Sequence, residues 1–399
     1  MMSILESISF MRILFVSTTS LVSHMYLLSF AKYLREKGHN VAFACSPWGY
    51  DDAPARLVEL REAGFTVYEI PLERSVQLWK DIKAFFSLEK LIRSEKFDLV
   101  HTCTSKAGFI GRFAAKLAGC PIIVHMPYDF FFRAYTSGPK RQIFIFLERL
   151  AAPFCHVMLF ISDAVREECL AYKMKHEATL IKVGYGIDIS EHIKFQTDIK
   201  TVRFQYGINE DDLLVGNIGR QVYNKGVETL IYAAAIVLKR FPSTHFIIAG
   251  DGPMRSDYEN LARSLGITDQ VQFIGYLPER KDVMQLMKAM DIFVLPTRRE
   301  GLGLVYVEAM ALGCAVVGSR IPPVSEIIKD GETGFLATVD DPEDFARAIT
   351  ILSENTNLRN QIGQSGEKQA IYNFNEKDVF ERIENIYRNL ARATGITFL

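Results

Sequence analysis

Apolar residues in this chain gather in short runs, and amphipathic stretches separate the runs. The run RILFVST (12–18) is rich in β-branched and aromatic side chains, and the following LLSFAKYLREK has apolar positions at helical spacing before Gly38. The same order recurs in the runs FDLVHTCT and CPIIVHM, with a helical pattern between them. Strands that alternate with helices predict parallel βαβ units whose helices cover both faces of a sheet.

The alternation is interrupted at residues 179–190 (TLIKVGYGIDIS) and resumes at LLVGNIGR (213–220). A chain of 399 residues is also long for one hydrophobic core, because single cores stop growing near about 250–300 residues. We therefore predict an α/β fold with two Rossmann-like domains that face each other across a cleft. The first domain is residues 11–190 with a final amphipathic helix at 376–399 that crosses back, and the second is residues 191–375.

The composition is that of a globular protein. Hydrophobic residues make up 49% of the chain and charged residues 23%, and a net charge of −1 does not favour nucleic acid as a partner. The six cysteines are far apart without C-x-x-C spacing, which indicates a reducing compartment and no structural zinc. We find no uncharged apolar run of about 18 residues and no basic n-region in the opening MMSILESISF, and we expect a cytoplasmic protein.

Two cations lie in the turn after a predicted strand, within VGNIGRQVYNKGVETLI (215–231). Arg220 and Lys225 precede a helix whose first amides and dipole favour negative charge, and an arginine can bind two phosphate oxygens at once. Gly219 beside them permits a close approach of the backbone. The pattern fits a diphosphate, although two surface cations in a loop would produce the same letters.

Two further strand ends precede turns of the same kind. AGDGPMR (249–255) contains Gly252 and has the strand–glycine–turn form of many βα loops, so it is a weak indication by itself. In GYLPERKDV (275–283), the backbone of Tyr276 and Leu277 could form hydrogen bonds with a nucleobase. Both segments would lie at the carboxyl ends of strands, where ligands of such sheets bind.

The segment REGLGLVYVEAMALG (299–313) places two carboxylates in an otherwise apolar stretch after the run DIFVLPT. Gly301 and Gly303 permit a tight turn with bare amides, and the helix that follows would point its N-terminus at a ligand. A buried carboxylate needs a partner, and the hydroxyls of a ribose or a hexose suit Glu300 and Glu308. The alternative is that Glu308 caps backbone amides and Glu300 is exposed.

The motifs GR-x4-KG, GDGP, EGLGLVYVEAMALGCAVV and SEIIKDGETGFL stand in this order, and together they resemble the retaining glycosyltransferases of family four, which have the GT-B fold. The resemblance extends from about Arg12 to the last helix, and it implies that neither a metal nor another cofactor is required. It also implies roles for the matching positions: Arg220 and Lys225 would hold the donor diphosphate, Glu300 the donor sugar, Glu308 the ribose, and the amides of Gly303, Leu304 and Val305 the sugar and phosphate.

The N-terminal half, DLVHTCTSKAGFIGRFAAKLAGCPIIVH, resembles members of the family that act on lipid-linked or polysaccharide acceptors. Such members commonly read H-T-V-H-G-F after the fifth strand, and the second histidine lies beside the reacting sugar. Here the letters are HMPYDF, so His125 matches the first histidine and Tyr128 takes the place of the second. Both are catalytic candidates, since tyrosine can also donate a hydrogen bond to a sugar, whereas a lone histidine is often a core residue at a strand end. STTSLVSH also lacks the family's glycine pair, and His101 and Cys103 replace its H-x-H.

Cations are in excess around the aromatic segment YDFFFRAYTSGPKRQIFIFLERL (128–150). A basic, aromatic segment can lie at the headgroup layer of an anionic membrane, where a lipid-linked acceptor would be presented. We therefore predict peripheral association with the inner face of the plasma membrane, with a buried helix and a charged rim as the alternative. The predicted acceptor and membrane face consists of Lys106, Arg112, Arg133, Lys140 and Arg141.

The predicted function is transfer of a hexose-type sugar from a nucleotide-diphosphate sugar to a lipid-linked or surface-polysaccharide acceptor, with retention of the anomeric configuration. UDP is the expected nucleotide because it is the default within the family. Two alternatives stay open at this point. One is a nucleotide-sugar epimerase of GT-B architecture, and the other is a non-catalytic nucleotide-sugar-binding partner in a glycan assembly complex, which the tyrosine at position 128 allows.

Overall fold

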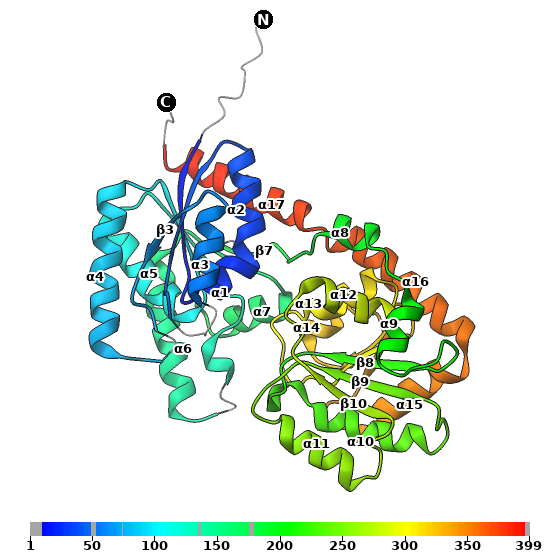
Figure 1. Ribbon diagram of the computed structural model, residues 1–399. Coiled ribbons are helices and arrows are strands. Elements are labelled where there is room, and N and C mark those ends of the chain that lie inside the picture. The colour runs from blue at the N-terminus through cyan, green and yellow to red at the C-terminus, as the bar shows by residue number, and fades with distance from the viewer. Residues whose placement is uncertain (1–9, 49–52, 74, 135–136, 175–178, 396–399) are drawn as a thin grey trace, which may run out of the picture. The chain divides into compact units, whose positions relative to one another are not determined.

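The computed structural model describes residues 10–48, 53–73, 75–134, 137–174 and 179–395. Contacts within the chain divide it into two compact units: unit 1 is Met1–Gly184 with Phe380–Leu399, and unit 2 is Tyr185–Val379. The boundaries predicted from the sequence lie after residue 190 and before residue 376. Each unit is an α/β structure built on one parallel sheet (Figure 1).

Unit 1 contains a seven-stranded sheet in the order β3-β2-β1-β4-β5-β6-β7, in which neighbouring strands are parallel. Its strands are β1 (Arg12–Val16), β2 (Asn40–Cys45), β3 (Thr66–Glu69), β4 (Leu99–Cys103), β5 (Ile122–Met126), β6 (Val157–Phe160) and β7 (Leu180–Lys182). Its helices are α1 (Ser20–Val22), the π-helical turn η1 (Ser23–Leu27), α2 (Leu28–Glu36), α3 (Ala53–Glu62), α4 (Leu78–Glu95), α5 (Ser105–Ala118), η2 (Phe131–Ala134), α6 (Pro139–Ala151), η3 (Ala152–Phe154) and α7 (Asp163–Ala171).

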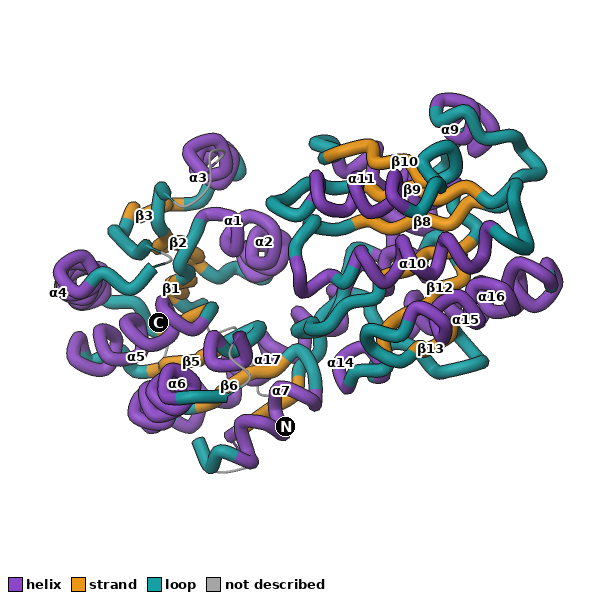
Figure 2. Tube along the Cα trace, turned by 90° about the horizontal axis from the view of Figure 1, so that it is seen from below, coloured by secondary structure: helices purple, strands orange, loops and turns teal. Residues whose placement is uncertain are grey.

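Helices cover both faces of this sheet, as its continuous apolar strands require. Helices α4, α5 and α6 lie side by side on one face, with α5 between the other two, and α1, α2 and α17 (Glu376–Ala393) lie on the opposite face (Figure 2). Residues 13–16 of β1 have no exposed surface. Because burial of one large apolar side chain contributes roughly 1.5–3 kcal/mol, this short strand adds strongly to the stability of the unit.

The last helix, α17, belongs to unit 1 from Phe380 onward. The Tyr387 hydroxyl is hydrogen-bonded to Nδ1 of His101 on β4, and the Glu384 carboxylate accepts a hydrogen bond of 2.9 Å from the Tyr33 hydroxyl on α2. Both His101 and Tyr387 are fully buried. Because buried polar groups need partners, these contacts fix the position of α17 on the sheet more narrowly than apolar packing alone would.

Unit 2 contains a six-stranded sheet in the order β10-β9-β8-β11-β12-β13, again with parallel neighbours. Its strands are β8 (Leu214–Ile218), β9 (His245–Ala249), β10 (Val271–Gly275), β11 (Ile292–Leu295), β12 (Ala315–Ser319) and β13 (Phe335–Ala337). Its helices are α8 (Ile189–Lys194), α9 (Ile199–Gln205), η5 (Tyr223–Lys225), α10 (Val227–Leu238), α11 (Arg255–Ser264), α12 (Arg280–Ala289), α13 (Leu304–Ala311), α14 (Pro322–Ser325), α15 (Pro342–Glu354) and α16 (Thr356–Asn373).

In both sheets the strand order reverses beside the first strand of the unit. β1 lies between β2 and β4, and β8 lies between β9 and β11. In unit 2 the helix after β8, α10, packs with α15 on one face of the sheet, whereas the helix after β11, α13, packs with α16 on the other (Figure 1). Loops that diverge in this way leave room for a ligand outside the carboxyl ends of the strands, so we expect a ligand site at the loops after β8 and β11.

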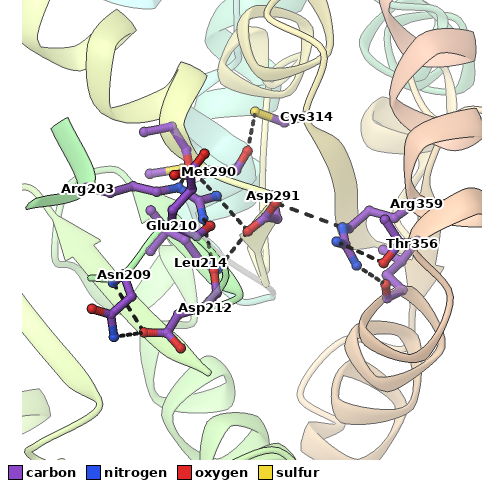
Figure 3. Close-up of polar contacts among 12 residues, drawn as sticks. Arg203, Asn209, Glu210, Asp212, Leu214, Met290, Asp291, Cys314, Thr356 and Arg359 are labelled. Atoms are coloured by element: carbon purple, nitrogen blue, oxygen red, sulfur yellow. Dashed lines mark hydrogen bonds and ion pairs between the residues drawn. The ribbon is translucent and has the colours of Figure 1, made fainter. Parts of the chain in front are cut away.

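The amino ends of β8 and β11 are held together by a largely buried ion pair (Figure 3). Arg203 of α9 donates a hydrogen bond of 2.8 Å to Oδ2 of Asp291, and the same oxygen accepts one of 2.8 Å from the Leu214 amide. Arg203 also donates to the carbonyl oxygen of Ala289, the last residue of α12. These contacts fix the two central strands at the edge opposite to the one that carries their loops.

Two sequence predictions concerned the state of the cysteines and the presence of a membrane-spanning segment. All six cysteines lie among the described residues and are buried thiols. Burial raises the pKa of Cys45 to about 11 and that of Cys314 to about 12, so neither is a nucleophilic thiolate at neutral pH. Within the described chain, no helix combines the length and the apolar character needed to span a bilayer.

Candidate functional site

The loops after β8 and β11 are bonded to each other. The Thr297 hydroxyl donates a hydrogen bond of 2.9 Å to the Asn224 carbonyl oxygen, and the Arg298 amide donates one of 2.8 Å to the same oxygen. Gly226 has a φ of +63°, and a Cβ at this position would lie 2.1 Å from the Pro296 carbonyl oxygen. The close approach therefore requires glycine at 226, and it brings the turn η5 against the loop that precedes α13.

This approach places Lys225 and Glu300 in contact. Nζ of Lys225 lies 2.5 Å from Oε1 of Glu300, and the two side chains are only 19% and 13% exposed. The alternative in which Glu300 is an exposed surface residue therefore does not hold. A cation and a carboxylate therefore meet where the strand order of unit 2 reverses, close in the chain to the N-terminus of α13.

The N-terminus of α13 lies in the same loop. Gly303 has a φ of +96° and precedes the first helical residue, Leu304. The amides of Leu304 and Val305 are in the first turn, where backbone N–H groups have no acceptor within the helix. The Tyr306 hydroxyl donates a hydrogen bond to the carbonyl oxygen of Leu295, the last residue of β11, and so anchors the turn. The helix end is thus held rigidly and can bind an anion.

Glu308 lies in the middle of α13 and does not cap the backbone. Its Oε1 accepts a hydrogen bond of 3.1 Å from Nη1 of Arg280, the first residue of α12, whose Nε donates one of 3.0 Å to Glu191 on α8. Arg280 was not among the residues predicted from the sequence, although Tyr276 and Leu277, a few residues before it, were. No pattern in the sequence marked this arginine, because its two carboxylate partners are far from it along the chain.

Arg220 follows the end of β8 after Gly219, and its side chain is exposed. The backbone beside it is bonded to the GDGP loop: the Gln221 amide donates a hydrogen bond of 2.8 Å to the Asp251 carbonyl oxygen, and the Gln221 side chain donates one of 2.8 Å to Gly250. Gly252 lies so close to this segment that a Cβ would be 2.3 Å from the Gln221 carbonyl oxygen. Gly252 therefore helps to hold the Arg220 loop in place, and Gln221, which is fully buried, is a second residue that the sequence analysis missed.

The predicted base-contacting segment follows β10 directly. Gly275 has a φ of +80°, and its carbonyl oxygen accepts a hydrogen bond of 2.7 Å from the Gly250 amide. Tyr276 is 66% exposed and Leu277 is half-buried. The candidate donor-binding positions Gly219, Gly252, Tyr276, Gly301 and Gly303 thus all lie at the carboxyl ends of strands of one sheet.

In unit 1 the structure corrects the interpretation of His125. Its side chain is fully buried on β5, with Nδ1 2.9 Å from the Thr102 hydroxyl, and a Cβ on Gly108 would lie 2.1 Å from its ring. Burial and the nearby charge of Arg112 lower the pKa of His125 well below its usual range. A neutral ring without exposed surface cannot contact a sugar, so His125 is a core residue and not a catalytic one.

Tyr128 is in a different position. It follows β5, is half-buried, and has a φ of +57°, which is rare for a residue with a bulky side chain. Its ring lies 5.4 Å from that of Tyr26, centroid to centroid. On the neighbouring strand end, Thr104 also has a positive φ of 68° and exchanges a hydrogen bond of 2.7 Å with Thr18. Strained backbone at two adjacent strand ends is typical of functional sites, and Tyr128 stays a candidate.

Most cations of the predicted acceptor and membrane face are engaged within unit 1. Arg112 was placed on that face incorrectly: its side chain is fully buried and forms an ion pair of 2.5 Å with Glu148. Lys106 forms an ion pair with Asp81, and Arg133 and Arg141 both contact Glu168. Lys140 is the member of the set that is exposed.

Within the described residues, no three histidine, cysteine, aspartate or glutamate side chains come together as ligands of one metal ion. Both glutamates of the unit 2 site are already ion-paired, Glu300 with Lys225 and Glu308 with Arg280.

Two family models match the chain, one for each part. Residues 23–184 match the model "Glycosyl transferase 4-like domain", and residues 198–369 match "Glycosyl transferases group 1". The first model lies within unit 1 and the second within unit 2, so the two descriptions apply to separate halves of one protein.

Relatives and solved structures agree with these matches. The chain is 27% identical over 80% of its length to the Escherichia coli UDP-Gal:alpha-D-GlcNAc-diphosphoundecaprenol alpha-1,3-galactosyltransferase, of which it covers 82%. It is 26% identical over 81% of its length to the Staphylococcus aureus capsular polysaccharide biosynthesis glycosyltransferase CapM, of which it covers 85%. The crystal structure of Anabaena Alr3699/HepE in complex with UDP has a TM-score of 0.80 at 22% identity, covering 95% of this chain and 100% of that one. The chain therefore belongs to the glycosyltransferases that join a 4-like domain to a group 1 domain, and it has the GT-B fold.

Proposed function

We propose that the chain transfers a hexose from a UDP-sugar to a lipid-linked or surface-polysaccharide acceptor, with retention of the anomeric configuration and without a metal ion. The observation that carries the proposal is the contact between Lys225 and Glu300 beside the N-terminus of α13. The names of two relatives support the choice of substrates: one acts from UDP-galactose on a diphosphoundecaprenol-linked sugar, and the other makes capsular polysaccharide. HepE, which shares the fold, was crystallised with UDP.

The geometry suits the charge that develops during such a reaction. Breaking the bond between sugar and phosphate leaves negative charge on the departing diphosphate. Lys225, Arg220 and the first-turn amides of Leu304 and Val305 would stabilise this charge, and electrostatic groups that are fixed in advance are effective because they need not reorganise. Glu300 would accept hydrogen bonds from hydroxyls of the donor sugar, while its contact with Lys225 keeps its carboxylate in place.

The phosphate-binding part of the proposal can be tested by thermal shift. UDP, GDP, ADP and their sugars are each added to the protein, since a ligand that binds only the folded state raises the unfolding midpoint. We expect a clear shift with one nucleotide, and we expect the double variant Arg220→Ala with Lys225→Ala to lose it. Arg240→Ala is the matched control, because Arg240 is an exposed arginine of unit 2 paired with Glu354 outside these loops. Equal shifts in the wild type and the double variant would contradict the assignment.

The chemistry is tested separately by incubating the protein with the nucleotide sugar that gives the largest shift. Slow release of free nucleotide supports a transferase, and transfer to a polyprenyl-diphosphate sugar with the anomeric configuration retained, read by NMR, would establish the full proposal. Epimerised sugar would indicate the epimerase. Binding without any chemistry would indicate a non-catalytic partner, and the substitution Tyr128→His would then be expected to restore slow turnover.

We also propose that unit 1 associates with the surface of an anionic membrane, through a face that differs from the predicted one. Three apolar side chains on α6, Ile143, Phe146 and Leu150, are 55%, 63% and 47% exposed at helical spacing, and Lys140 and Arg149 beside them are exposed too. An amphipathic helix with cations beside its apolar face is typical of interfacial binding.

The N-terminal turns of α4, on the other side of α5, extend this face (Figure 2). Leu78, Trp79 and Phe86 are 69%, 82% and 59% exposed. In a flotation assay at low salt we expect vesicles with anionic lipid to retain the protein, and we expect Trp79→Ala with Phe146→Ala to weaken retention. Phe204→Ala removes an aromatic side chain that is 83% exposed in unit 2 and should have no effect. Failure of the wild type to float with anionic vesicles would overturn the proposal.

A further inference from the structure

The carboxylate of Glu308 is held by a guanidinium that is itself held from the other side. Arg280 donates from Nη1 to Oε1 of Glu308 at 3.1 Å and from Nε to Oε2 of Glu191 at 3.0 Å. The three residues come from α12, α13 and α8, which all belong to unit 2. One arginine therefore spans two helices and fixes the direction of a carboxylate that lies near the loops of the site.

The two oxygens of Glu308 have different surroundings. Oε1 accepts a hydrogen bond from Arg280, whereas Oε2 has no hydrogen-bond partner among the residues that the structure describes, and the side chain is 22% exposed. An ionised carboxylate can accept several hydrogen bonds. The free oxygen is therefore available to hydroxyl groups, and the engaged one prevents the side chain from rotating away.

Arg280 also has a particular place along the chain. It begins α12 directly after the segment that leaves β10, in which Tyr276 and Leu277 are the predicted contacts of the base. In a nucleoside the ribose is attached directly to the base. Arg280 thus links the segment that would bind the base to Glu308, which would bind the ribose.

We infer that Arg280 is a positioning residue that orients Glu308 toward the ribose hydroxyls of the donor nucleotide. This inference rests on the proposed function, since it takes Glu308 as the ribose-binding carboxylate. Arg280 does not itself contact the ligand. It acts by removing conformational freedom from Glu308 before binding, and a group that is ordered in advance loses less entropy when the ligand arrives.

A purely structural role is the competing explanation, because α8 and α13 pack against each other and Arg280 joins them. The two roles differ in what they predict for ribose recognition. A structural brace would affect the unfolding midpoint and would weaken all nucleotides to the same degree. A positioning residue would weaken the preference for a ribose over a deoxyribose.

The test measures dissociation constants by calorimetry for UDP, GDP and ADP, each compared with its 2′-deoxy form. For the nucleotide that binds best, the ratio of the deoxy to the ribo constant reports the ribose contact. We expect Glu308→Gln to remove most of this preference and Arg280→Ala to reduce it about five- to tenfold, which is within the range of one ordinary net hydrogen bond. The double variant should lose no more than Glu308→Gln alone, because both changes act on the same contact.

Two further variants distinguish a positioning role of Arg280 from a structural one. Glu191→Ala removes the brace but leaves the contact between Arg280 and Glu308, so it should retain more of the ribose preference than Arg280→Ala does, even if both variants lower the unfolding midpoint by a similar amount. Arg280→Lys keeps the charge and should restore part of the preference. If Arg280→Ala does not fold, Arg280→Gln, which keeps a long side chain, replaces it.

The outcomes separate the inference from the function on which it rests. If Glu308→Gln lowers the preference and Arg280→Ala leaves it unchanged, Arg280 is only a brace and the inference is overturned. If neither variant changes it, Glu308 does not bind the ribose and the inference fails, while a loss of binding in the Arg220 and Lys225 double variant would still support the donor site. If no nucleotide binds the wild type, the proposed function fails as well.

Discussion

Replacing Glu148 with alanine should destabilise unit 1 far more than replacing an exposed acidic residue. Glu148 of α6 and Arg112 of α5 form an ion pair of 2.5 Å in which the side chains are 7% and 0% exposed. Nε of Arg112 donates a further hydrogen bond of 2.8 Å to the Gly108 carbonyl oxygen, but Nη1 has no partner. Without the Glu148 carboxylate, the buried guanidinium of Arg112 would keep the Gly108 carbonyl oxygen as its one hydrogen-bond acceptor among the described residues.

The size of the effect follows from burial. Leaving a buried charge unpaired costs about 3–5 kcal/mol, whereas an exposed pair contributes about 0–1 kcal/mol. The matched control is Glu69→Ala, because Glu69 pairs with Arg61 at 2.7 Å but both side chains are nearly half exposed. Replacing both partners of the buried pair, with Arg112→Met and Glu148→Leu, should recover most of the loss, since two apolar side chains of similar volume need no partner.

The assay is urea unfolding followed by tryptophan fluorescence and circular dichroism, with linear extrapolation to water. Trp48 and Trp79, the two tryptophans of the chain, both lie in unit 1, so fluorescence follows the unit that contains the pair. The reasoning is refuted if Glu148→Ala costs no more than Glu69→Ala. It is also refuted if the double replacement is as unstable as the single one.

Two other changes have definite expected results. Gly226→Ala forces a Cβ to within 2.1 Å of the Pro296 carbonyl oxygen at a φ of +63°. We expect the free energy of unfolding to fall by about 2–3 kcal/mol and the nucleotide-induced thermal shift to be lost. The control is Gly207→Ala, where the space is open at a φ of +71° and the expected loss is about 1 kcal/mol. Burial, and then the charge of Asp188, raise the pKa of Glu376 from 4.5 to about 7. The folded state thus keeps a proton that the unfolded state releases, so the free energy of unfolding should fall as pH rises from 4.5 to 7, by about 1–2 kcal/mol after allowance for solvent screening. Urea titrations across this range should show a smaller fall for Glu376→Gln than for the wild type, and an equal slope in both proteins would count against the assignment.

Much of the fold and part of the candidate site follow from patterns that are local in the sequence. The run at residues 12–18 predicted a strand, and β1 occupies Arg12–Val16 because short β-branched and aromatic runs suit a strand buried on both faces. The glycines at 301 and 303 predicted a turn before a helix, and α13 begins at Leu304 directly after Gly303 in the left-handed region. The loop with Arg220 and Lys225 was predicted as a diphosphate site in the same way, from cations and glycines within a few residues of one another.

Other features depended on residues that the chain brings together from far apart. In the sequence, Arg112 is one cation of an amphipathic helix, and nothing near it shows that Glu148 lies opposite, 36 residues later, inside the core. The same holds for His125, whose letters match a motif but whose ring packs on Gly108. Arg280 lies in segment 275–283, which was predicted to contact the base, but its partners Glu191 and Glu308 are 89 and 28 residues away along the chain.

The division has one physical cause. Hydrophobic period, turn chemistry and helix ends are set by interactions between near neighbours, so the sequence by itself determined which segments are strands, which are helices, and where loops with bare amides begin. Whether a charged side chain faces water or a partner depends on strand order, register and the packing of helices on the sheet. Those quantities exist only after the chain has folded, and so the tertiary structure alone decided that Lys225 meets Glu300, that Arg280 holds Glu308, and that Arg112 and His125 are buried.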